Sequence, residues 1–165
     1  MQERQIDYLA SVIATCKGKR VVGRTRLQKM IFLLQKLKLP SDYSFSMHFY
    51  GPYSEDVQAD LAVLDLIDVI TEIPKAGDSG QYYVLEIKGS DFHQIDLSNW
   101  RKPIKEMENV QSVVLELAAT YIAFRDSGYN AKDAELQVQR MKGLKCDGGN
   151  LKAAYDLLTE LGLYS

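Results

Sequence analysis

The stretch FYGPYSEDVQADL, residues 49–61, places a Tyr-Gly-Pro-Tyr-Ser corner directly before an acidic helical run. Gly51 can adopt backbone angles that are closed to other residues, and Pro52 fixes the angle that follows. Ser54 is suited to accept a hydrogen bond from the first turn of a helix, whose acidic residues then lie at the positive end of the helix dipole. The stretch therefore predicts a turn from an extended segment into a helix.

Apolar residues at helical spacing predict two helices before this corner, at 3–16 and 25–37. The second helix is expected to start at a capping box, because Thr25 is followed three residues later by Gln28. Alternating apolar side chains then indicate a short extended segment at 44–50, which leads into the corner.

After the corner, the sequence indicates first a β-hairpin and then more helices. Two segments rich in β-branched and aromatic residues flank a loop that contains proline and glycine, which is typical of a hairpin. Beyond a polar, irregular segment, apolar residues return at helical spacing. We therefore expect helices at 54–65, 104–126, 131–142 and 150–161, and strands at 67–73 and 81–87.

The predicted fold class is mainly α with a small antiparallel β-hairpin (α+β). Three helices followed by a hairpin is the order of elements in a winged-helix domain, where the hairpin forms the wing. The predicted division is a winged-helix-like domain at 1–88, a linker at 89–102, and a three-helix extension at 103–165 that packs on the first part.

Length and composition indicate one compact domain, because the chain has 165 residues, of which 46% are hydrophobic and 25% charged. No apolar run approaches the ~20 residues of a membrane-spanning helix, and the polar residues 1–5 do not resemble a signal peptide. Cys16 and Cys146 match no metal or redox spacing and suit a reducing compartment. We therefore expect a cytoplasmic protein with no membrane partner.

The sequence lacks the motifs of common enzyme chemistry. Ser54 does not lie in a Gly-x-Ser-x-Gly elbow, and no glycine-rich loop precedes a lysine. His48 and His93 show no metal-ligand spacing with each other or with the cysteines. We expect no catalytic residues, no metal and no cofactor, and hence a protein that is not an enzyme.

Positive charge gathers in the first third of the chain. Residues 1–52 contain nine Lys or Arg and three Asp or Glu, whereas the rest contains 11 basic and 19 acidic residues. Such a block can attract phosphate or an acidic protein surface, or it can face the acidic part of its own chain. The tyrosines of the corner are either core residues or anchors of an interface. The candidate partner- or nucleic-acid-binding residues are Lys19, Arg20, Arg24, Arg26, Lys29, Tyr50 and Tyr53.

Several short motifs together resemble a known group of proteins. They are Gly23-Arg24, Leu27-Gln28-Lys29, Phe49-Tyr50-Gly51-Pro52-Tyr53-Ser54, the helix with Leu61 and Leu64 that runs into Ile67, and, towards the end, Leu115-Glu116-Leu117-Ala118-Ala119-Thr120 with Lys142. In this combination the chain resembles the YwgA-like family of uncharacterised prokaryotic proteins and, more distantly, the Panacea domain of many antitoxins. The resemblance implies a helical, winged-helix-related fold without catalytic activity. In the antitoxin members, the domain neutralises a toxin by binding it directly.

Two functions are compatible with these features. In a DNA-binding winged helix the third helix enters the major groove, but here that helix carries Glu55, Asp56, Asp60 and Asp65 and has no Lys or Arg. We therefore expect a non-enzymatic regulatory interaction module that binds a toxin-like or regulatory protein partner, and an antitoxin-like role is one form of this function. A winged-helix DNA-binding transcriptional regulator is the alternative, and the partner's identity and the oligomeric state stay open.

Overall fold

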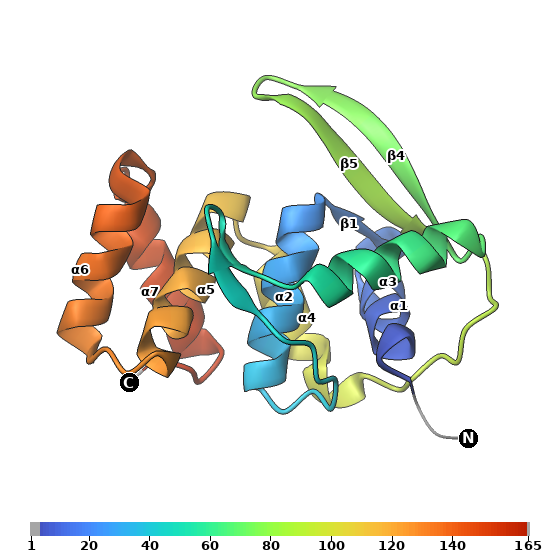
Figure 1. Cartoon of the computed structure of the whole chain (residues 1–165), viewed down its shortest axis with the longest axis horizontal. Helices are drawn as coiled ribbons and strands as arrows, with labels where there is room; N and C mark the ends of the chain where they lie inside the picture. The colour runs from blue at the N-terminus through green and yellow to red at the C-terminus, as the bar shows by residue number, and fades with distance from the viewer. Residues whose placement is uncertain (1–3, 165) are drawn as a thin grey trace.

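A computed structural model describes residues 4–164 of the chain (Figure 1). It is mainly helical with small antiparallel sheets, in agreement with the predicted class. The elements are α1 (Gln5–Thr15), η1 (Lys17–Lys19), β1 (Arg20–Val22), α2 (Arg24–Lys36), β2 (Ser46–His48), β3 (Gly51–Tyr53), α3 (Glu55–Leu66), β4 (Ile70–Gly77), β5 (Gly80–Ile87), η2 (Ser98–Trp100), α4 (Arg101–Glu108), α5 (Ser112–Asp126), α6 (Ala131–Lys142), η3 (Gly143–Cys146) and α7 (Asn150–Glu160). Residue 3, the predicted start of the first helix, lies outside the described residues.

The central helix α2 is present as predicted but begins differently. Its apolar side chains, such as Leu27 and Ile31, are fully buried in one core cluster that extends from α1 to α7. The predicted capping box at Thr25 is wrong, because the helix starts at Arg24 after Gly23, which has a φ of +99°. Gln28, the expected partner in that box, forms its hydrogen bonds with a distant segment instead.

A three-stranded antiparallel sheet with the order β1–β5–β4 carries a long hairpin that projects from the helical body (Figure 1). The prediction placed a loop at 74–80, but the strands pair until Gly77 faces Gly80, so that only two residues form the turn. Pro74 is compatible with β4 because β4 is an edge strand, where a missing N–H breaks no sheet hydrogen bond. The first strand was also predicted too early, since the N–H of Val69 still bonds to the carbonyl oxygen of Leu64 at the end of α3.

The helix predicted at 104–126 is two helices, α4 and α5. Apolar spacing runs through the break, because Met107 and Val114 are both buried on either side of it. The carbonyl oxygens of Met107 and Val110 accept hydrogen bonds from the guanidinium of Arg26, at 2.8 and 2.7 Å. A side chain from α2 thus satisfies two carbonyl groups at the break between α4 and α5, one in the last turn of α4 and one in the connection.

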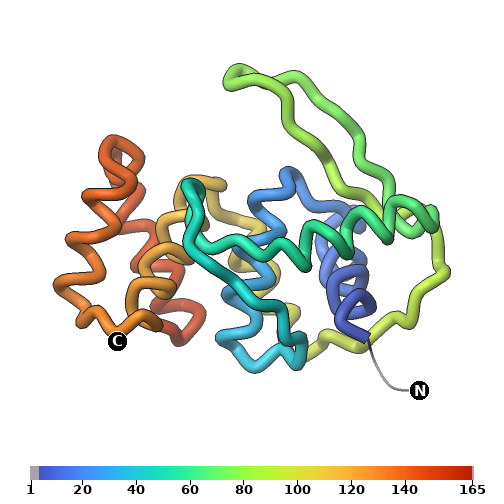
Figure 2. The backbone as a smooth tube through the Cα atoms, in the orientation of Figure 1, coloured from blue at the N-terminus to red at the C-terminus, as the bar shows by residue number. Residues whose placement is uncertain are grey.

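The segment between the sheet and α4 runs past α1, as the trace in Figure 2 shows. Ile95 and Leu97 are buried in the common core, and the N–H of Ile95 donates to the hydroxyl of Ser11 at 2.9 Å. The division of the chain at 89–102 stays a prediction. Within residues 4–164, none of the helices has both the length and the apolar character needed to cross a membrane.

Candidate interaction site

The Tyr-Gly-Pro corner is a tight turn between two short strands that packs directly on α5. β2 and β3 pair so that His48 faces Gly51, which leaves Phe49 and Tyr50 at the tip of the turn. Gly51 has the predicted positive φ, at +99°. A Cβ atom at this position would lie 2.7 Å from the Oγ1 of Thr120, so the corner needs glycine for two reasons, backbone angle and space.

Two polar side chains of α2 hold the backbone that follows the tip. The amide of Gln28 donates to the carbonyl oxygen of Ser54 at 2.9 Å and accepts from its N–H at 2.8 Å. The ammonium group of Lys29 donates to the carbonyl oxygen of Pro52 at 2.9 Å. Ser54 also accepts from the N–H of Val57 at 3.2 Å, which confirms the predicted start of α3. The corner is therefore fixed to α2 at consecutive positions.

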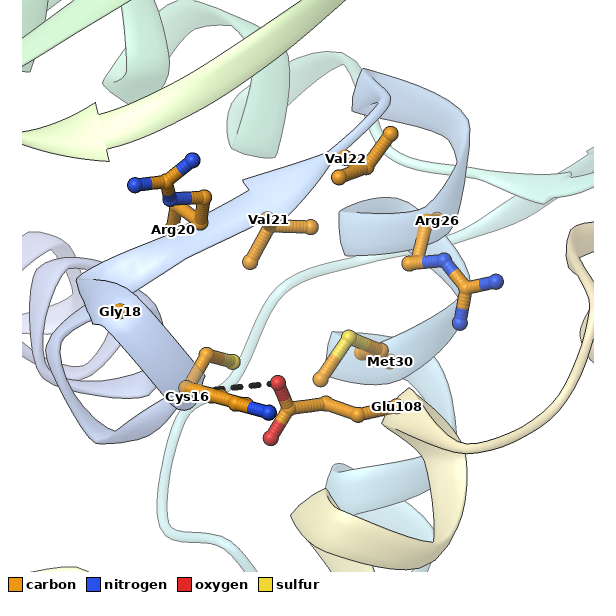
Figure 3. Close-up of a pocket in the computed structure, with 9 residues that line it drawn as sticks. Cys16, Gly18, Arg20, Val21, Val22, Arg26, Met30 and Glu108 are labelled. Carbon is orange, nitrogen blue, oxygen red and sulfur yellow. Dashed lines mark hydrogen bonds between the residues drawn. The ribbon is translucent and has the colours of Figure 1, made fainter.

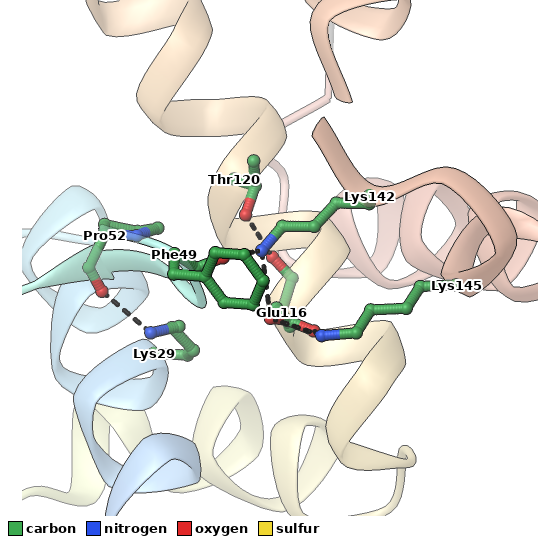
Figure 4. A network of polar contacts seen from close by, with 7 residues as sticks. All are labelled: Lys29, Phe49, Pro52, Glu116, Thr120, Lys142 and Lys145. Atoms are coloured by element: carbon green, nitrogen blue, oxygen red, sulfur yellow. Dashed lines mark hydrogen bonds and ion pairs between the residues drawn. The ribbon is translucent and has the colours of Figure 1, made fainter. Parts of the chain in front are cut away.

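A cluster of charged side chains holds the same corner from the other side (Figure 4). Lys142 donates to the carbonyl oxygen of Phe49 at 2.9 Å and to Glu116 Oε1 at 3.0 Å. Lys145 donates to both carboxylate oxygens of Glu116, at 3.2 and 3.1 Å. Glu116 on α5 thus accepts hydrogen bonds from Lys142 at the end of α6 and from Lys145 in η3. Lys142 also donates to the backbone at the tip of the turn.

This cluster has more positive than negative charge. The pKa of Lys29 is lowered to about 8, mainly by burial; Glu116 opposes this shift, and the nearby charges of Lys142 and Lys145 add to it. Burial also lowers the pKa of Lys142. Three lysines therefore share the field of a single carboxylate, Glu116, inside the described part of the chain.

The tip of the turn exposes aromatic rings despite this bracing. Phe49 is 80% and Tyr50 56% exposed, and their rings meet edge to face. The ammonium of Lys145 lies 5.0 Å from the centroid of the Tyr50 ring. Leu144, beside that lysine in sequence, is 85% exposed. Tyr50 is therefore a surface residue, whereas Tyr53 is half-buried.

A cavity of about 510 Å³ lies between the start of α2 and the β2–β3 turn. Its lining includes the predicted candidates Arg24, Lys29, Tyr50 and Tyr53, together with His48 and Phe49. The fold thus brings four of the seven predicted residues, from separate parts of the sequence, together around this cavity.

Arg24 is engaged at the base of the long hairpin. Its guanidinium forms an ion pair with Glu72 on β4, with one contact of 3.2 Å, and lies 4.0 Å from the ring centroid of Tyr83 on β5. Its positive charge is therefore balanced within the fold.

Arg20 and Arg26 line a different cavity of about 470 Å³, shown in Figure 3. Arg26 holds the end of α4, and Arg20 is an exposed residue 3.9 Å from Glu86. Cys16 also lines this cavity, but burial raises the pKa of its thiol to about 12, which leaves it a poor nucleophile. Lys19 is exposed and lines neither cavity.

Sequence reasoning identified Lys29 but missed Glu116, Lys142, Lys145 and the tip residue Phe49 as site residues. Glu116 offered a signal, because it lies within a run of apolar residues that predicts a buried helix, where a charge requires a partner. Its partners Lys142 and Lys145 carried no such signal, since lysine at the end of a helix is an ordinary surface residue.

The fold and the site define a small, mainly helical α+β protein in which a lysine-braced corner presents exposed aromatic rings. No family model matches the chain. The chain is similar to "Uncharacterized protein YwgA" of Bacillus subtilis (strain 168), with 33% identity over 109 residues, which are 63% of this chain and 66% of that protein, just under two thirds. The similarity supports the predicted resemblance to a YwgA-like family. The relation to the Panacea domain stays a prediction.

Proposed function

We propose that the protein is a non-enzymatic regulatory module that binds a protein partner through the Tyr-Gly-Pro corner. The observation that carries this proposal is the exposure of Phe49 and Tyr50 on a backbone that packs on α5 and accepts hydrogen bonds from Lys29 of α2 and Lys142 of α6. Aromatic residues are frequent anchors of protein interfaces, and a rigid backbone reduces the entropy lost on binding.

The charge beside the tip supports a partner with an acidic, apolar surface. Lys145 retains partial exposure next to the Tyr50 ring, and Leu144 extends the apolar surface. A partner carboxylate near this lysine would add to the steering of encounter, while the rings supply the buried contact area. An antitoxin-like role is one form of this proposal, in which the partner is a toxin.

We also propose a winged-helix relationship for the first part of the chain. The order α1, β1, α2, α3, β4, β5 and the sheet order β1–β5–β4 support it, because the hairpin follows the third helix and pairs with a strand between the first two.

The geometry favours a protein partner over DNA. Glu55, Asp56 and Asp65 of α3 are exposed and would face the phosphates of a major groove. Among the basic residues, Arg26 and Lys29 donate to backbone carbonyl groups of the protein itself. Part of the positive block predicted from the sequence is therefore not free to contact phosphates.

The test is retention of a partner from a lysate of the native cell by immobilised protein. We compare the wild type with Phe49→Ser and with the control Leu66→Ser, which changes a residue of similar exposure, 82%, at the end of α3. We expect a protein that the wild type and the control retain and that Phe49→Ser loses. Equal retention by all three forms would contradict the proposal.

A second measurement tests the DNA alternative. We titrate the protein with a fluorescent duplex at about 50 and 200 mM salt, because binding through phosphates weakens steeply between these concentrations. We expect no appreciable binding. Submicromolar binding at the higher salt that is lost on Lys19→Glu with Arg20→Glu would replace the leading function by the DNA-binding one.

A further inference from the structure

The cavity between α2 and the β2–β3 turn contains a buried cation without a counter-ion of its own. Lys29 is only 2% exposed, and its hydrogen bond in the described chain goes to the uncharged carbonyl of Pro52. An ammonium has three protons to donate, so one such bond leaves capacity for a ligand.

The neighbouring charges do not remove this imbalance. Glu116 accepts hydrogen bonds from Lys142 and Lys145, and Arg24 at the cavity is already matched by Glu72. A buried charge without a partner is costly, and an anion that enters beside it removes part of that cost.

The rest of the cavity is built for an apolar or aromatic body. The rings of His48 and Tyr53 lie 4.8 Å apart, and Tyr50 and Phe49 add further ring surface. The volume of about 510 Å³ lies within the range of small-molecule sites, about 300–1,000 Å³.

We propose that this cavity binds a carboxylate group attached to an aromatic or apolar body, with the carboxylate directed at Lys29. A carboxylate fits better than a phosphate, because phosphate sites usually combine several donors, such as a bidentate arginine or a row of backbone N–H groups. The carboxylate can belong to a free small molecule or to an acidic side chain. The inference does not require the partner proposed above, because it rests on Lys29 and the cavity, although the cavity shares Phe49 and Tyr50 with the tip of the turn.

The experiment is an NMR titration of the protein with phenylacetate, followed through backbone amide resonances. Phenylacetamide has the same shape without the charge and is the matched ligand control. We expect shifts confined to the start of α2 and the β2–β3 turn, with affinity at least tenfold weaker for the amide. Equal shifts with both ligands, or shifts elsewhere, would overturn the proposal.

Two variants test the site itself. Lys29→Met keeps most of the length of the side chain without its charge, and Thr25→Trp adds bulk to the cavity lining from an exposed position without changing Lys29. Both should lose phenylacetate binding at least tenfold, whereas the exposed control Lys152→Met should retain it. If Lys29→Met does not fold, Thr25→Trp decides; binding that survives in a folded Thr25→Trp variant refutes the site.

A peptide arm distinguishes the two sources of the carboxylate. Acetyl-Phe-Glu-Phe-amide is compared with acetyl-Phe-Gln-Phe-amide in the same titration. Binding of the glutamate peptide alone, with no effect of phenylacetate, assigns the cavity to an acidic side chain, and the reverse assigns it to a free carboxylate. No shift with any carboxylate up to about 10 mM, which corresponds to a binding free energy weaker than about −3 kcal/mol, refutes the inference and leaves the partner test at Phe49 unaffected.

Discussion

Replacing Gly51 by alanine should destabilise the protein for two separable reasons. Its φ of +99° is a conformation that costs a residue with a side chain about 1–3 kcal/mol. The added Cβ would also lie 2.7 Å from the Oγ1 of Thr120 and 3.3 Å from the Cε of Lys29, and overpacking of this kind costs about 1–3 kcal/mol more. We expect a total loss of about 3 kcal/mol in the free energy of unfolding.

The assay is urea unfolding followed by circular dichroism. With a denaturant dependence of about 2 kcal/mol per molar urea, a loss of about 3 kcal/mol moves the midpoint down by about 1.5 M. Gly128→Ala is the matched control, because Gly128 has a φ of +101° and no atom within 4 Å of its added Cβ. The control should therefore lose only the backbone part, about 1–3 kcal/mol, and always less than Gly51→Ala because it lacks the steric part.

A double variant tests the steric part directly. Thr120→Ala removes the hydroxyl that the new Cβ would meet, so Gly51→Ala should cost about 1 kcal/mol less in that background than in the wild type. Equal losses for Gly51→Ala and Gly128→Ala, with no relief from Thr120→Ala, would refute the claim that the corner packs tightly on α5.

Three further predictions concern buried charge. Glu116→Gln should lower the free energy of unfolding by about 3–5 kcal/mol, because it leaves buried ammonium groups without their carboxylate, while the exposed Asp156→Asn should cost at most about 0.5 kcal/mol in the same urea series. Arg26→Met should cost about 2–3 kcal/mol, because it leaves two carbonyl groups between α4 and α5 without their donor, whereas the control Arg20→Met should cost at most about 0.5 kcal/mol. Similar losses for the two variants would contradict the structural role of Arg26. Burial lowers the pKa of Lys29 from 10.5, its ordinary value, to about 8 in the folded protein, so the unfolded state binds more protons between these values and stability rises with pH there. Between pH 7 and 9.5 the wild type should gain about 2 kcal/mol relative to Lys29→Met, and a constant difference would show that Lys29 titrates normally.

The sequence predicted those parts of the corner that depend on near neighbours. Gly51 supplies the positive φ, and Ser54 accepts from an N–H three residues later, so both features are visible in a short window. Gln28 was predicted to take part in a local cap. In the structure its buried amide instead bonds to both the N–H and the carbonyl oxygen of Ser54, 26 residues away.

Most of the other parts that were wrong or missed depend on distant residues. The apolar spacing at 104–126 continues across the helix break, and only Arg26 on another helix shows why the chain can stop and restart there. Glu116 was visible as a charge in an apolar run, but periodicity could not show that Lys142 and Lys145 would meet it. The strand β1 has three residues and pairs with β5 more than sixty residues later, which leaves no local pattern to detect.

The two hydrogen bonds from Arg26 to the end of α4 also bear on how the chain is made. They join residues 81 and 84 positions apart, so α2 leaves the ribosome long before its acceptors exist. At a synthesis rate of about 5–20 residues per second, that interval is roughly 4–17 s. During this time the emerging chain can form α1, α2 and α3, but the guanidinium of Arg26 does not yet have the two carbonyl acceptors that it has in the folded protein.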